Sequence, residues 1–424
     1  MPHHKPPTLV IISQVYAPDP AAVGQHLHEA AVALTKRGVH VRVLTSARGY
    51  DNPDERYPAN ETLDGVTVQR LPLPNAGKGS IASRLVGGTV FLAQAAAAAL
   101  RSPHIDHLLI STSPPHTGPI GALVSLLRRV PTTFWVMDIN PDQVVTQGQL
   151  SEDALPVRLL EWGIAATLRR AFAVVTLDRF MAERLSRKAD ISHKLTVMPP
   201  WPLEQHAAPV PHADNPFVRA HGLAGKLVVM YSGNISLTHP IDSVLEAAAQ
   251  LTDRPDIAFV FIGGGQGKQR IEEFAALHPA AHILILPYQS LAEVRYSLSA
   301  AHIHVVTMGD DQVGIVHPCK VYGAMAMARA ILYVGPEESH VSDIINRSAA
   351  GYAFRHGQSG AIADRLRALA DGPREYLTEL GEQAQSMAEA EFSRKTLITR
   401  FCEVIEQGLQ RPGHGKAGLD SARA

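Results

Sequence analysis

The sequence predicts an α/β protein built from two doubly wound, Rossmann-like domains that face each other across a cleft. Three observations predict this fold: a length of 424 residues, strand-like segments alternating with helix-like ones, and a proline-rich break near the middle. A chain of this length exceeds what one hydrophobic core usually organises, so we expect two domains. We place them at residues 1–203 and 217–410, with a linker at 204–216 and a disordered tail at 411–424, and the last helix either stays with the second domain or crosses back to the first.

Short runs rich in β-branched and other apolar residues indicate the strands. In the first half these runs are LVIIS, HVRVLTS, HLLIST, TTFWVMD, AVVTL and LTVMP. In the second half they are LVVMYSGN, IAFVFIGGG, HILILPY, HIHVVTM and a strand at the end of residues 311–332, before a final set of helices. Helix-length patterns separate them, at residues 24–36, 118–129, 157–170, 243–251, 268–277 and 291–300. This alternation is typical of parallel sheets covered on both faces.

The break at residues 199–216 contains six prolines, which exclude regular helix and central strand. Two doubly wound domains joined there would place the carboxyl ends of both sheets across one cleft, where such sheets bind ligands. The longest apolar stretch, residues 85–100, is too short to cross a membrane and contains two glycines and a glutamine. It is expected to form a buried or surface-lying helix.

Composition excludes several classes of protein. The formal net charge of -1 argues against a nucleic-acid partner. Two distant cysteines favour a reduced, cytoplasmic compartment, and the N-terminus lacks the features of a signal peptide. His26 and His28 lie on different faces of a helix, and the sequence contains neither HxxxH nor CxxC. We therefore predict no metal site and no cofactor.

Residues 311–332, DQVGIVHPCKVYGAMAMARAIL, carry the clearest chemical signal. A polar, glycine-containing loop runs into the start of a helix, and Lys320 lies at that junction. Free backbone N–H groups, the positive end of a helix and a lysine together favour an anion. The segment therefore predicts a phosphate site.

Three loops in the first half follow predicted strands. Gly24 begins a helix after a proline-rich loop, where a small residue lets a substrate approach the backbone, or simply permits a tight turn. TSPPHTG, which contains His116, starts another helix and is either a binding element or only a capped helix. Asp138 follows an apolar strand and is expected to hydrogen-bond or deprotonate a substrate hydroxyl. The alternative is that Asp138 anchors its own loop.

Two loops in the second half have the chemistry of phosphate and sugar binding. Gly233 and Asn234 follow one strand, and the glycine-rich loop at 263–267 follows the next. Glycine allows close approach of a ligand to the backbone, and the asparagine amide bonds a phosphate or sugar oxygen. The glycine-rich loop is a weak signal alone, and the first half lacks the GxGxxG expected for a nicotinamide dinucleotide.

Taken in order, these elements resemble glycosyltransferase family 4, in the branch of polysaccharide-biosynthesis enzymes with a Pro-Ser-Lys before a helix. The resemblance covers residues 8–405. It rests on Ser13, Gln14, Tyr16, Pro18 and Gly24, on TSPP, on Trp135 and Asp138, on FVFIGGGQGKQRIEE, and on Pro318, Cys319 and Lys320. It implies the GT-B fold and metal-free transfer, with retention of configuration. The acceptor would bind the first domain and the nucleotide sugar the second.

The resemblance implies catalytic roles for Asp138, which would orient or deprotonate the acceptor, and for Lys320, which would stabilise the leaving diphosphate. The residues implied in substrate binding are Gly24, His116, Gly233, Asn234, His239, Gly264, Tyr288, Pro318, Cys319 and Tyr322.

Three positions depart from the family pattern. Gly323 stands where a glutamate is expected to bind ribose, and Tyr322, Asp310 or Asp311 is the candidate replacement. Leu237 stands where a basic residue is usual, so neutralisation of the diphosphate falls to Lys320, helped by Lys268 or Arg270. Met137 stands where many relatives have histidine.

The implied partners are a nucleoside diphosphate sugar, with a UDP-sugar expected, and a hydroxyl acceptor, with a polyprenyl-linked one expected. Two alternatives stay open at this point. One is a sugar-nucleotide epimerase of the same fold, and the other is a non-catalytic homologue that binds sugar nucleotides.

Basic residues flank apolar helices in the first half. They form either a membrane-contacting face at the inner side of the membrane or solvated helix ends. The residues concerned are Arg84, Arg101, Arg128, Arg129, Arg158, Arg169 and Arg170, with Leu123, Leu126, Leu127, Leu159, Trp162 and Leu168.

Overall fold

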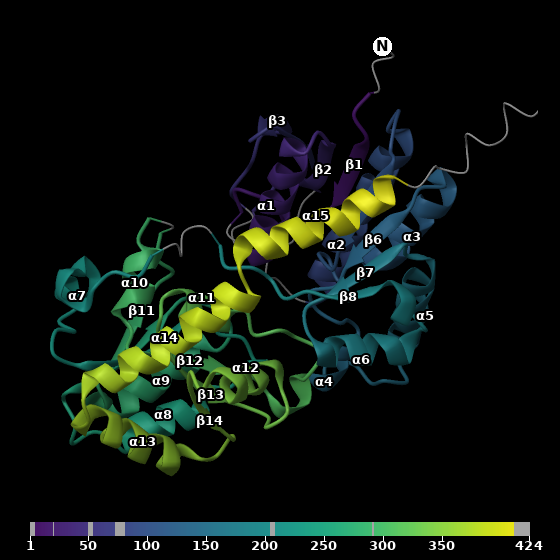
Figure 1. Ribbon diagram of the computed structural model, residues 1–424. Helices are drawn as coiled ribbons and strands as arrows, with labels where there is room; N and C mark the ends of the chain where they lie inside the picture. The colour runs from purple at the N-terminus through teal and green to yellow at the C-terminus, as the bar shows by residue number, and fades with distance from the viewer. Residues whose placement is uncertain are drawn as a thin grey trace, which may run out of the picture. The chain divides into compact units, whose positions relative to one another are not determined.

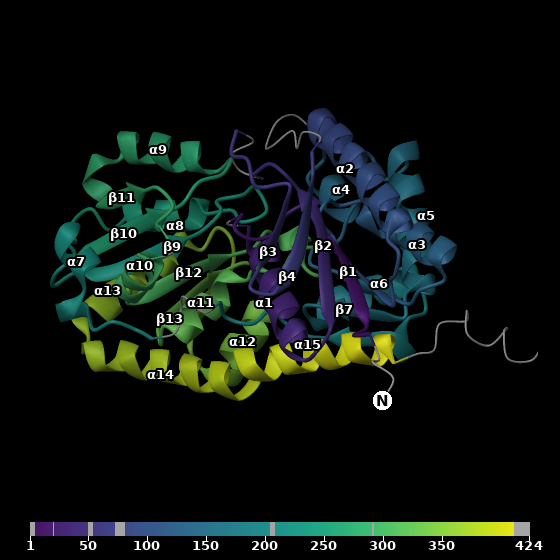
Figure 2. The same ribbon diagram turned by 90° about the horizontal axis from the view of Figure 1, so that it is seen from above.

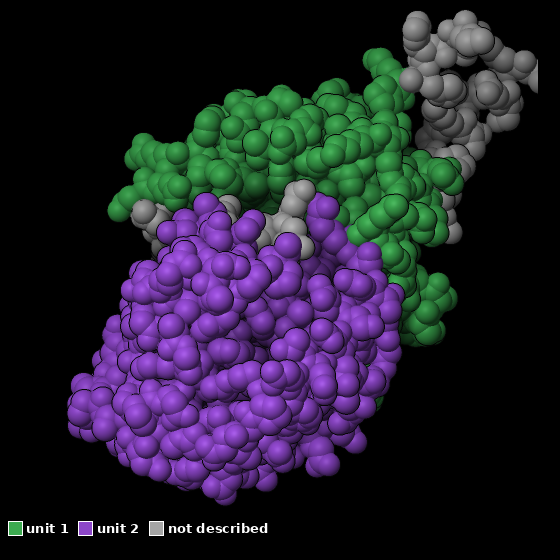
Figure 3. Space-filling model, turned by 60° about the vertical axis from the view of Figure 1, so that its left-hand side comes forward, with its two compact units in different colours: residues 1–199, 395–424 green, residues 200–394 purple. Residues whose placement is uncertain are grey.

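The computed structural model describes residues 5–19, 21–49, 54–72, 81–203, 208–290 and 292–410, with the backbone alone for residues 81–85. The predicted tail at 411–424 lies outside these residues. The chain divides into two compact units, residues 1–199 with 395–424 and residues 200–394 (Figure 3). Each unit contains its own sheet, so the predicted fold class of two Rossmann-like α/β domains is confirmed.

The described residues of the first unit form an eight-stranded sheet in the order β3-β4-β2-β1-β5-β6-β7-β8. All neighbouring strands are parallel except β3 and β4. The strands are β1 (Thr8–Ile12), β2 (His40–Ser46), β3 (Asn60–Leu63), β4 (Val66–Leu71), β5 (His107–Ser111), β6 (Thr132–Trp135), β7 (Ala173–Thr176) and β8 (Leu195–Val197). Leu9 of β1 pairs with Val41 on one side and His107 on the other, so β1 is central and its residues are buried.

Helices connect and cover these strands (Figures 1 and 2). They are α1 (Ala22–Lys36), α2 (Ile81–Arg101), α3 (Thr117–Arg128), α4 (Asp142–Thr146), α5 (Leu155–Arg170), α6 (Arg179–Lys188) and the last helix of the chain, α15 (Arg394–Leu409). Phe401 of α15 packs against Trp135 at the end of β6, with ring centroids 4.5 Å apart. The last helix therefore contributes to the core of the first unit.

The described residues of the second unit form a six-stranded parallel sheet in the order β11-β10-β9-β12-β13-β14. The strands are β9 (Leu227–Ser232), β10 (Ile257–Ile262), β11 (Ile283–Leu286), β12 (Ile303–Thr307), β13 (Ala330–Val334) and β14 (Gly351–Phe354). The helices are α7 (Pro216–Ala220), α8 (Asp242–Ala249), α9 (Lys268–Leu277), α10 (Val294–Ala300), α11 (Lys320–Ala326), α12 (His340–Ser348), α13 (Ser359–Asp371) and α14 (Arg374–Glu391).

Successive residues of the second sheet enter two different cores. Leu227, Val229 and Tyr231 of β9 belong to one, with side chains of α8, α13 and α14, whereas Val228 and Met230 belong to the other, with side chains of α7. Strands buried on both faces are continuous apolar runs, which is why the sequence pattern located them.

The order of strands reverses at one point in each sheet, between β1 and β5 and between β9 and β12. Ligands of doubly wound sheets bind at the carboxyl ends of the strands beside such a reversal. Loops from the two sides meet there: the Gln14 N–H donates to the Ser113 carbonyl at 2.8 Å in the first unit. The fold therefore indicates one candidate site in each unit.

Three short strands lie where no strand was predicted. β3 and β4 form a hairpin around Asp64 and Gly65, which have φ of 49° and 85°. Asp-Gly between two alternating runs is a hairpin signal, and it was available in the sequence. β14 lies within the stretch predicted as a final set of helices, and its residues, GYAF, include no β-branched residue and are not fully buried.

The described part of the predicted linker, residues 208–216, belongs to the second unit. The Val210 N–H donates to Ser299 Oγ at 3.0 Å, and the Asn215 amide donates to the Tyr296 carbonyl at 2.8 Å. The Asn215 side chain also accepts from the Phe217 N–H and caps α7, which begins with Pro216. The stretch contains one short 3₁₀ helix, His212–Asp214, and these hydrogen bonds anchor it to the second unit.

Candidate functional site

Glycines occupy the carboxyl ends of β9 and β10 in the second unit. Gly233 has φ of 127° and Gly263 has φ of 134°, where other residues are strained. A Cβ on Gly263 would lie 2.1 Å from the Gly233 carbonyl oxygen, so the two loops meet backbone against backbone. Gly264 also joins these two loops, since its carbonyl accepts a hydrogen bond from the Ile235 N–H at 2.7 Å. The structure thus brings together Gly233 and Gly264.

Lys320, the first residue of α11, reaches this junction of loops. Its Nζ donates to the Asn234 carbonyl at 3.1 Å and lies 4.9 Å from the centroid of the Tyr231 ring. A Cβ on Gly233 would lie only 2.9 Å from Lys320 Cε. Desolvation lowers the pKa of the ammonium to about 8. Lys320 therefore lies with Gly233 and Asn234 as a partly desolvated cation at the carboxyl edge of the sheet.

Two features of this arrangement were not expected from the sequence. Tyr231, which supports the Lys320 ammonium with its ring, was missed, because a tyrosine near the end of a strand is usually a core residue. α11 is only seven residues long, so its dipole is that of a two-turn helix. The lysine ammonium is thus the main positive charge of this loop-to-helix junction.

His239 connects the loop after β9 with the end of β12. Its Nδ1 lies 2.7 Å from the Thr307 carbonyl oxygen, which can only accept, so Nδ1 carries the proton and Nε2 has a lone pair. Burial, together with the charge of Lys320, lowers the pKa of His239 to about 3. A neutral imidazole of this tautomer accepts a hydrogen bond from a hydroxyl group.

Tyr288 follows β11 and presents an accessible aromatic ring. The side chain is 50 % exposed, and a Cβ on Gly264 would lie 3.1 Å from its Cε2 atom. The ring therefore lies beside the glycine-rich loop, as the resemblance implies for a residue of the base pocket.

The residues around Lys320 mainly hold its loop in place. Pro318 is buried, and the Cys319 N–H and thiol both donate to the His317 carbonyl, at 2.9 and 3.4 Å. Tyr322 is 3 % exposed, and its hydroxyl lies 2.7 Å from Nε2 of both His317 and His340. The two histidines hold the Tyr322 hydroxyl in place, and the contact of Tyr322 with ribose stays a prediction.

The other candidates for ribose and diphosphate binding already have partners. Asp310 pairs with Arg355 at 3.3 Å, and the Asp311 carboxylate accepts from the Gln312 amide at 3.0 Å. Lys268 pairs with Glu272 at 3.4 Å and Arg270 with Asp242 at 3.0 Å. Arg355, which follows β14 and is half exposed, was missed because its strand was missed.

In the first unit, Gly24 makes room for another part of the protein. A Cβ at this position would lie 3.0 Å from both N and Cα of Tyr16, and Gly24 is buried. The space that the sequence suggested for a substrate is thus occupied by the Tyr16 backbone, and Gly24 acts through packing. Tyr16 is fixed in turn, since its hydroxyl lies 3.0 Å from Nδ1 of His28 and the Nε2 of His28 lies 3.0 Å from Asp64.

His116 precedes α3 and packs its ring against α2, without a capping hydrogen bond from its side chain. Its Nε2 lies 3.2 Å from Thr89 Oγ1, and a Cβ on Gly88 would lie 2.8 Å from its Cε1. Burial lowers the pKa of His116, so the ring is neutral at physiological pH. The imidazole is partly accessible and lies at the carboxyl end of β5.

Asp138 is the third residue after β6. The two residues between them are buried, whereas the Asp138 side chain is half-buried. The N–H groups of Met137 and Asp138 both donate to Thr112 Oγ1, at 3.3 Å. Thr112 belongs to the TSPPHTG loop, and it lines a small cavity with Asp138 and Asn140. Two of the predicted elements of the first unit therefore meet at the carboxyl ends of β5 and β6.

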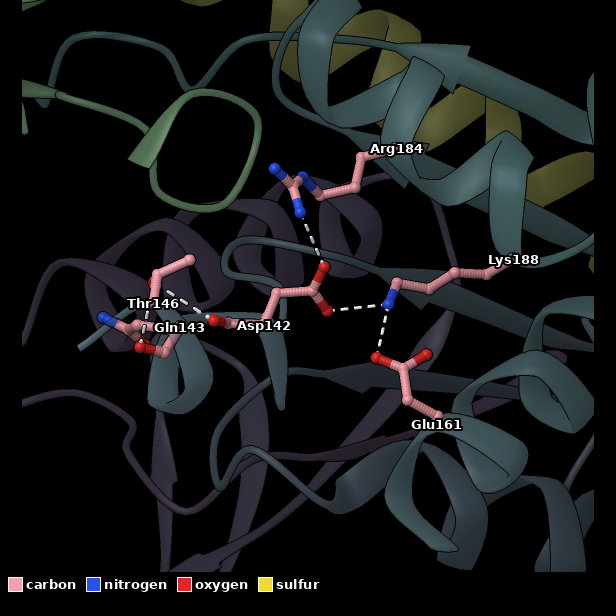
Figure 4. A network of polar contacts seen from close by, with 6 residues as sticks. All are labelled: Asp142, Gln143, Thr146, Glu161, Arg184 and Lys188. Carbon is pink, nitrogen blue, oxygen red and sulfur yellow. Dashed lines mark hydrogen bonds and ion pairs between the residues drawn. The ribbon is translucent and has the colours of Figure 1, made fainter. Parts of the chain in front are cut away.

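Beyond Asp138 the chain is anchored by a network of ion pairs (Figure 4). Asp142 bonds Arg184 at 2.9 Å and Lys188 at 2.7 Å, and Lys188 also bonds Glu161 at 2.5 Å. Burial alone would raise the pKa of Asp142, but the bonds and charges of Lys188 and Arg184 outweigh it and lower the pKa. Burial raises the pKa of Glu161. The network joins α4 to α5 and α6.

We expect Lys188→Met to lower the free energy of unfolding by about 2 kcal/mol, because it leaves the largely buried Asp142 with only one cation and Glu161 with none. Arg187→Met on the same helix is the matched control: its pair with Glu183 is 71 % and 60 % exposed. It should change the free energy by less than about 0.5 kcal/mol. Urea unfolding at neutral pH measures both. Equal effects would contradict a stabilising role for the network.

Leu168 of the predicted membrane-contacting face is fully buried, which corrects its assignment. Leu123, Leu126, Leu127, Leu159 and Trp162 are exposed, by 47 to 71 %. The Arg84 side chain lies outside the described side chains. Among the described residues, no helix combines the length and the apolar character needed to cross a bilayer. Within the same residues, no three His, Cys, Asp or Glu side chains are grouped as metal ligands.

Two family models match the chain, one to each unit. Residues 21–201 match a glycosyl transferase 4-like domain, and residues 216–387 match the glycosyl transferases group 1 domain. The chain is 26% identical over 283 residues to the probable glycosyltransferase WbjE of Pseudomonas aeruginosa, covering 66% of this chain and 70% of that one. It is 24% identical over 330 residues to the putative colanic acid biosynthesis glycosyl transferase WcaI of Escherichia coli (strain K12), covering 74% and 79%.

Solved structures share the fold over nearly the whole chain. Sucrose-phosphate synthase from Thermosynechococcus elongatus has a TM-score of 0.73 at 15% identity, covering 95% of this chain and 98% of that one. Anabaena HepE in complex with UDP and glucose has a TM-score of 0.68 at 13% identity, covering 94% and 99%. The family models account for most of both units, and this chain therefore belongs to the GT-B glycosyltransferases of the family 4 type and is a glycosyltransferase.

Proposed function

We propose that this glycosyltransferase moves a sugar from a nucleoside diphosphate sugar to a hydroxyl acceptor, with retention of configuration, in the assembly of a surface polysaccharide. The donor binds the second unit and the acceptor binds the first. Lys320 carries the proposal, since its ammonium lies 3.1 Å from the Asn234 carbonyl, at the strand reversal of the second sheet. A cation held there by glycine loops is suited to a diphosphate.

The geometry supports a division of roles within the donor site. The Lys320 ammonium faces the diphosphate, and Asn234 offers its exposed amide. The neutral His239, whose Nε2 only accepts, faces a donor hydroxyl. The Tyr288 ring offers a flat surface for a base. Since a structural neighbour, Anabaena HepE, was solved with UDP-glucose, a UDP-sugar is the donor that we propose.

The chemical step is a transfer between two oxygens. The bond between the anomeric carbon and the diphosphate breaks, and Lys320 stabilises the negative charge that develops on the leaving oxygen. The acceptor hydroxyl forms the new bond, and Asp138 orients it and withdraws its proton. Thr112 holds the Asp138 backbone, at 3.3 Å, so the carboxylate is positioned by two loops. Retention follows from the family resemblance.

One relative supports a place in polysaccharide assembly, since WcaI is described as a putative colanic acid biosynthesis glycosyl transferase. We infer a polyprenyl-linked acceptor at the cytoplasmic face of the membrane from the family resemblance. The epimerase and the non-catalytic homologue are not favoured, because both family models and the curated relatives are glycosyltransferases.

The test is to incubate the protein with a panel of nucleoside diphosphate sugars and polyprenyl-linked acceptors. We expect release of the nucleoside diphosphate only when an acceptor is present, and a product whose anomeric coupling constant by NMR matches that of the donor. A product of opposite configuration would overturn retention. A new sugar-nucleotide stereoisomer formed without acceptor would favour the epimerase.

A further inference from the structure

Two helices of the first unit, α3 and α5, pack closely through small residues. A Cβ on Gly163 would lie 2.6 Å from Cγ of Pro119, and a Cβ on Gly118 would lie 3.1 Å from Oγ1 of Thr167. These inward faces leave no room for larger side chains. Some large apolar side chains of these helices are buried, among them Val124, Ile164 and Leu168, but others lie on the outside.

Six of these outward side chains are well exposed. They are Leu123 (47%), Leu126 (54%), Leu127 (58%), Leu155 (69%), Leu159 (60%) and Trp162 (71%), and we call them the α3–α5 face. Positions 155, 159 and 162 follow helical spacing, so they lie along one side of α5, and the leucines of α3 cluster in the same way. Apolar side chains gathered on adjacent helices mark an interaction surface, whereas single exposed ones do not.

Positive charge predominates around this face. Among the described side chains, α2, α3 and α5 contain five arginines, Arg101, Arg128, Arg158, Arg169 and Arg170, and one acidic residue, Glu161, while Glu152 and Asp153 lie exposed on the turn before α5. Glu161 is paired with Lys188 and so offers little charge to a partner. Arg158 and Arg169 lie four residues before and seven after Trp162, on the same side of α5. A partner of this face must be apolar in part and anionic.

A basic cavity lies where the face ends. It has a volume of about 910 Å³ and is lined by Leu126 of the face and by Arg129, Arg170, His193 and Lys194, with no acidic residue among its lining. Lys194 also donates to the carbonyls of Arg169 and Ala171, at 2.7 and 2.9 Å, at the end of α5. The cavity extends the same positive surface and suits phosphate groups.

We propose that the α3–α5 face docks this protein on a bilayer of anionic phospholipids, with Trp162 and the leucines in the interfacial layer and Arg158 and Arg169 on lipid phosphates. Tryptophan, leucine and arginine are the residues that favour this layer. A second copy fits less well, because a two-fold contact would set arginines against arginines. This inference goes beyond the proposed reaction, and membrane binding is measurable without donor or acceptor.

Trp162 provides a direct test. The chain has three tryptophans, and the other two, Trp135 and Trp201, are 1% exposed. Titrating the full chain with vesicles of phosphatidylcholine and phosphatidylglycerol should shift its emission to shorter wavelength, and pure phosphatidylcholine should not. Lipids brominated in the acyl chain should quench the shifted emission. Arg158→Gln with Arg169→Gln should weaken the binding about thirty-fold, at about 1 kcal/mol per arginine.

Variants that lack Trp162 cannot be followed by its fluorescence, so their binding to the same vesicles is measured by co-sedimentation. Leu159→Ser with Trp162→Ser should reduce the bound fraction more than tenfold, as a loss of apolar contact predicts. The control is Leu277→Ser on α9 in the second unit, where the leucine is 78% exposed, and this variant should bind like the wild type. Binding that is equal on neutral vesicles, or unchanged in either double variant, would overturn the proposal. So would short-wavelength emission before vesicles are added, which would indicate that another copy or another segment covers Trp162.

Discussion

Replacing Lys320 with methionine is expected to lower kcat by about a hundred- to a thousand-fold, the effect of removing one preorganised group that stabilises developing negative charge. Methionine keeps the length of the side chain above the Tyr231 ring but removes the ammonium, which lies 4.9 Å from that ring. The affinity for the free nucleoside diphosphate should fall as well, because the charge contacts the product. Release of nucleoside diphosphate measures the first effect and calorimetry the second.

The pH dependence of donor binding gives the Lys320 prediction a signature of its own. The pKa of Lys320 is lowered to about 8 in the free protein, and a bound diphosphate favours the charged form and raises it. Affinity should therefore be constant below that pH and should fall, by up to about tenfold per pH unit, above it. In Lys320→Met this fall should disappear. Persistence of the same slope in the variant would assign the titration to another group.

Lys226→Met is the matched control for Lys320→Met, since Lys226 precedes β9 at the opposite, amino end of the same strand. We expect wild-type kcat and wild-type affinity for the nucleoside diphosphate. A similar loss in both variants would point to a general effect of charge and would remove the case for a diphosphate site at Lys320.

Asp138→Asn is expected to lower kcat by about a hundred-fold or more while donor affinity stays at the wild-type value. Asparagine has the same shape and leaves the backbone bonds from residues 137 and 138 to Thr112 in place. It removes the carboxylate that accepts the proton of the acceptor hydroxyl. Initial rates at saturating donor and acceptor measure the effect, and calorimetry with the nucleoside diphosphate checks the donor site.

Asp153→Asn is the control for Asp138→Asn, because Asp153 lies on an exposed turn before α5 and should be replaceable without effect. A wild-type rate in Asp138→Asn would remove Asp138 from the proposed chemistry. A fall in donor affinity that equals the fall in rate would instead place this carboxylate in donor binding.

Most of the parallel strands could be predicted because burial on both faces makes them continuous apolar runs. β9 and β10 are examples, and their residues enter cores on both sides of the sheet. The missed strands include β3 and β14. β3 alternates between exposed and half-buried residues, and no residue of β14 is fully buried, so neither strand is a continuous apolar run.

Candidate residues of the second unit were predictable for a topological reason. Parallel strands all end at one edge, so polar residues and glycines that follow successive strands come together there. Gly233, Asn234 and Lys320 are far apart in the chain, yet a side chain at position 320 bonds the carbonyl at 234. The residue types at the strand ends were therefore enough to suggest an anion site.

By itself the sequence determined the two-domain α/β class, most strands and the residues that gather at the strand ends, because apolar periodicity and strand termination are local properties. Only the tertiary structure decided which contacts each residue at the strand ends makes. Gly24 makes room for the Tyr16 backbone, and the Tyr322 hydroxyl lies between two histidines, whereas Lys320 is left partly desolvated with its ammonium above an aromatic ring. Partners distant in the chain set each of these outcomes, since packing and desolvation depend on contacts that no local pattern records.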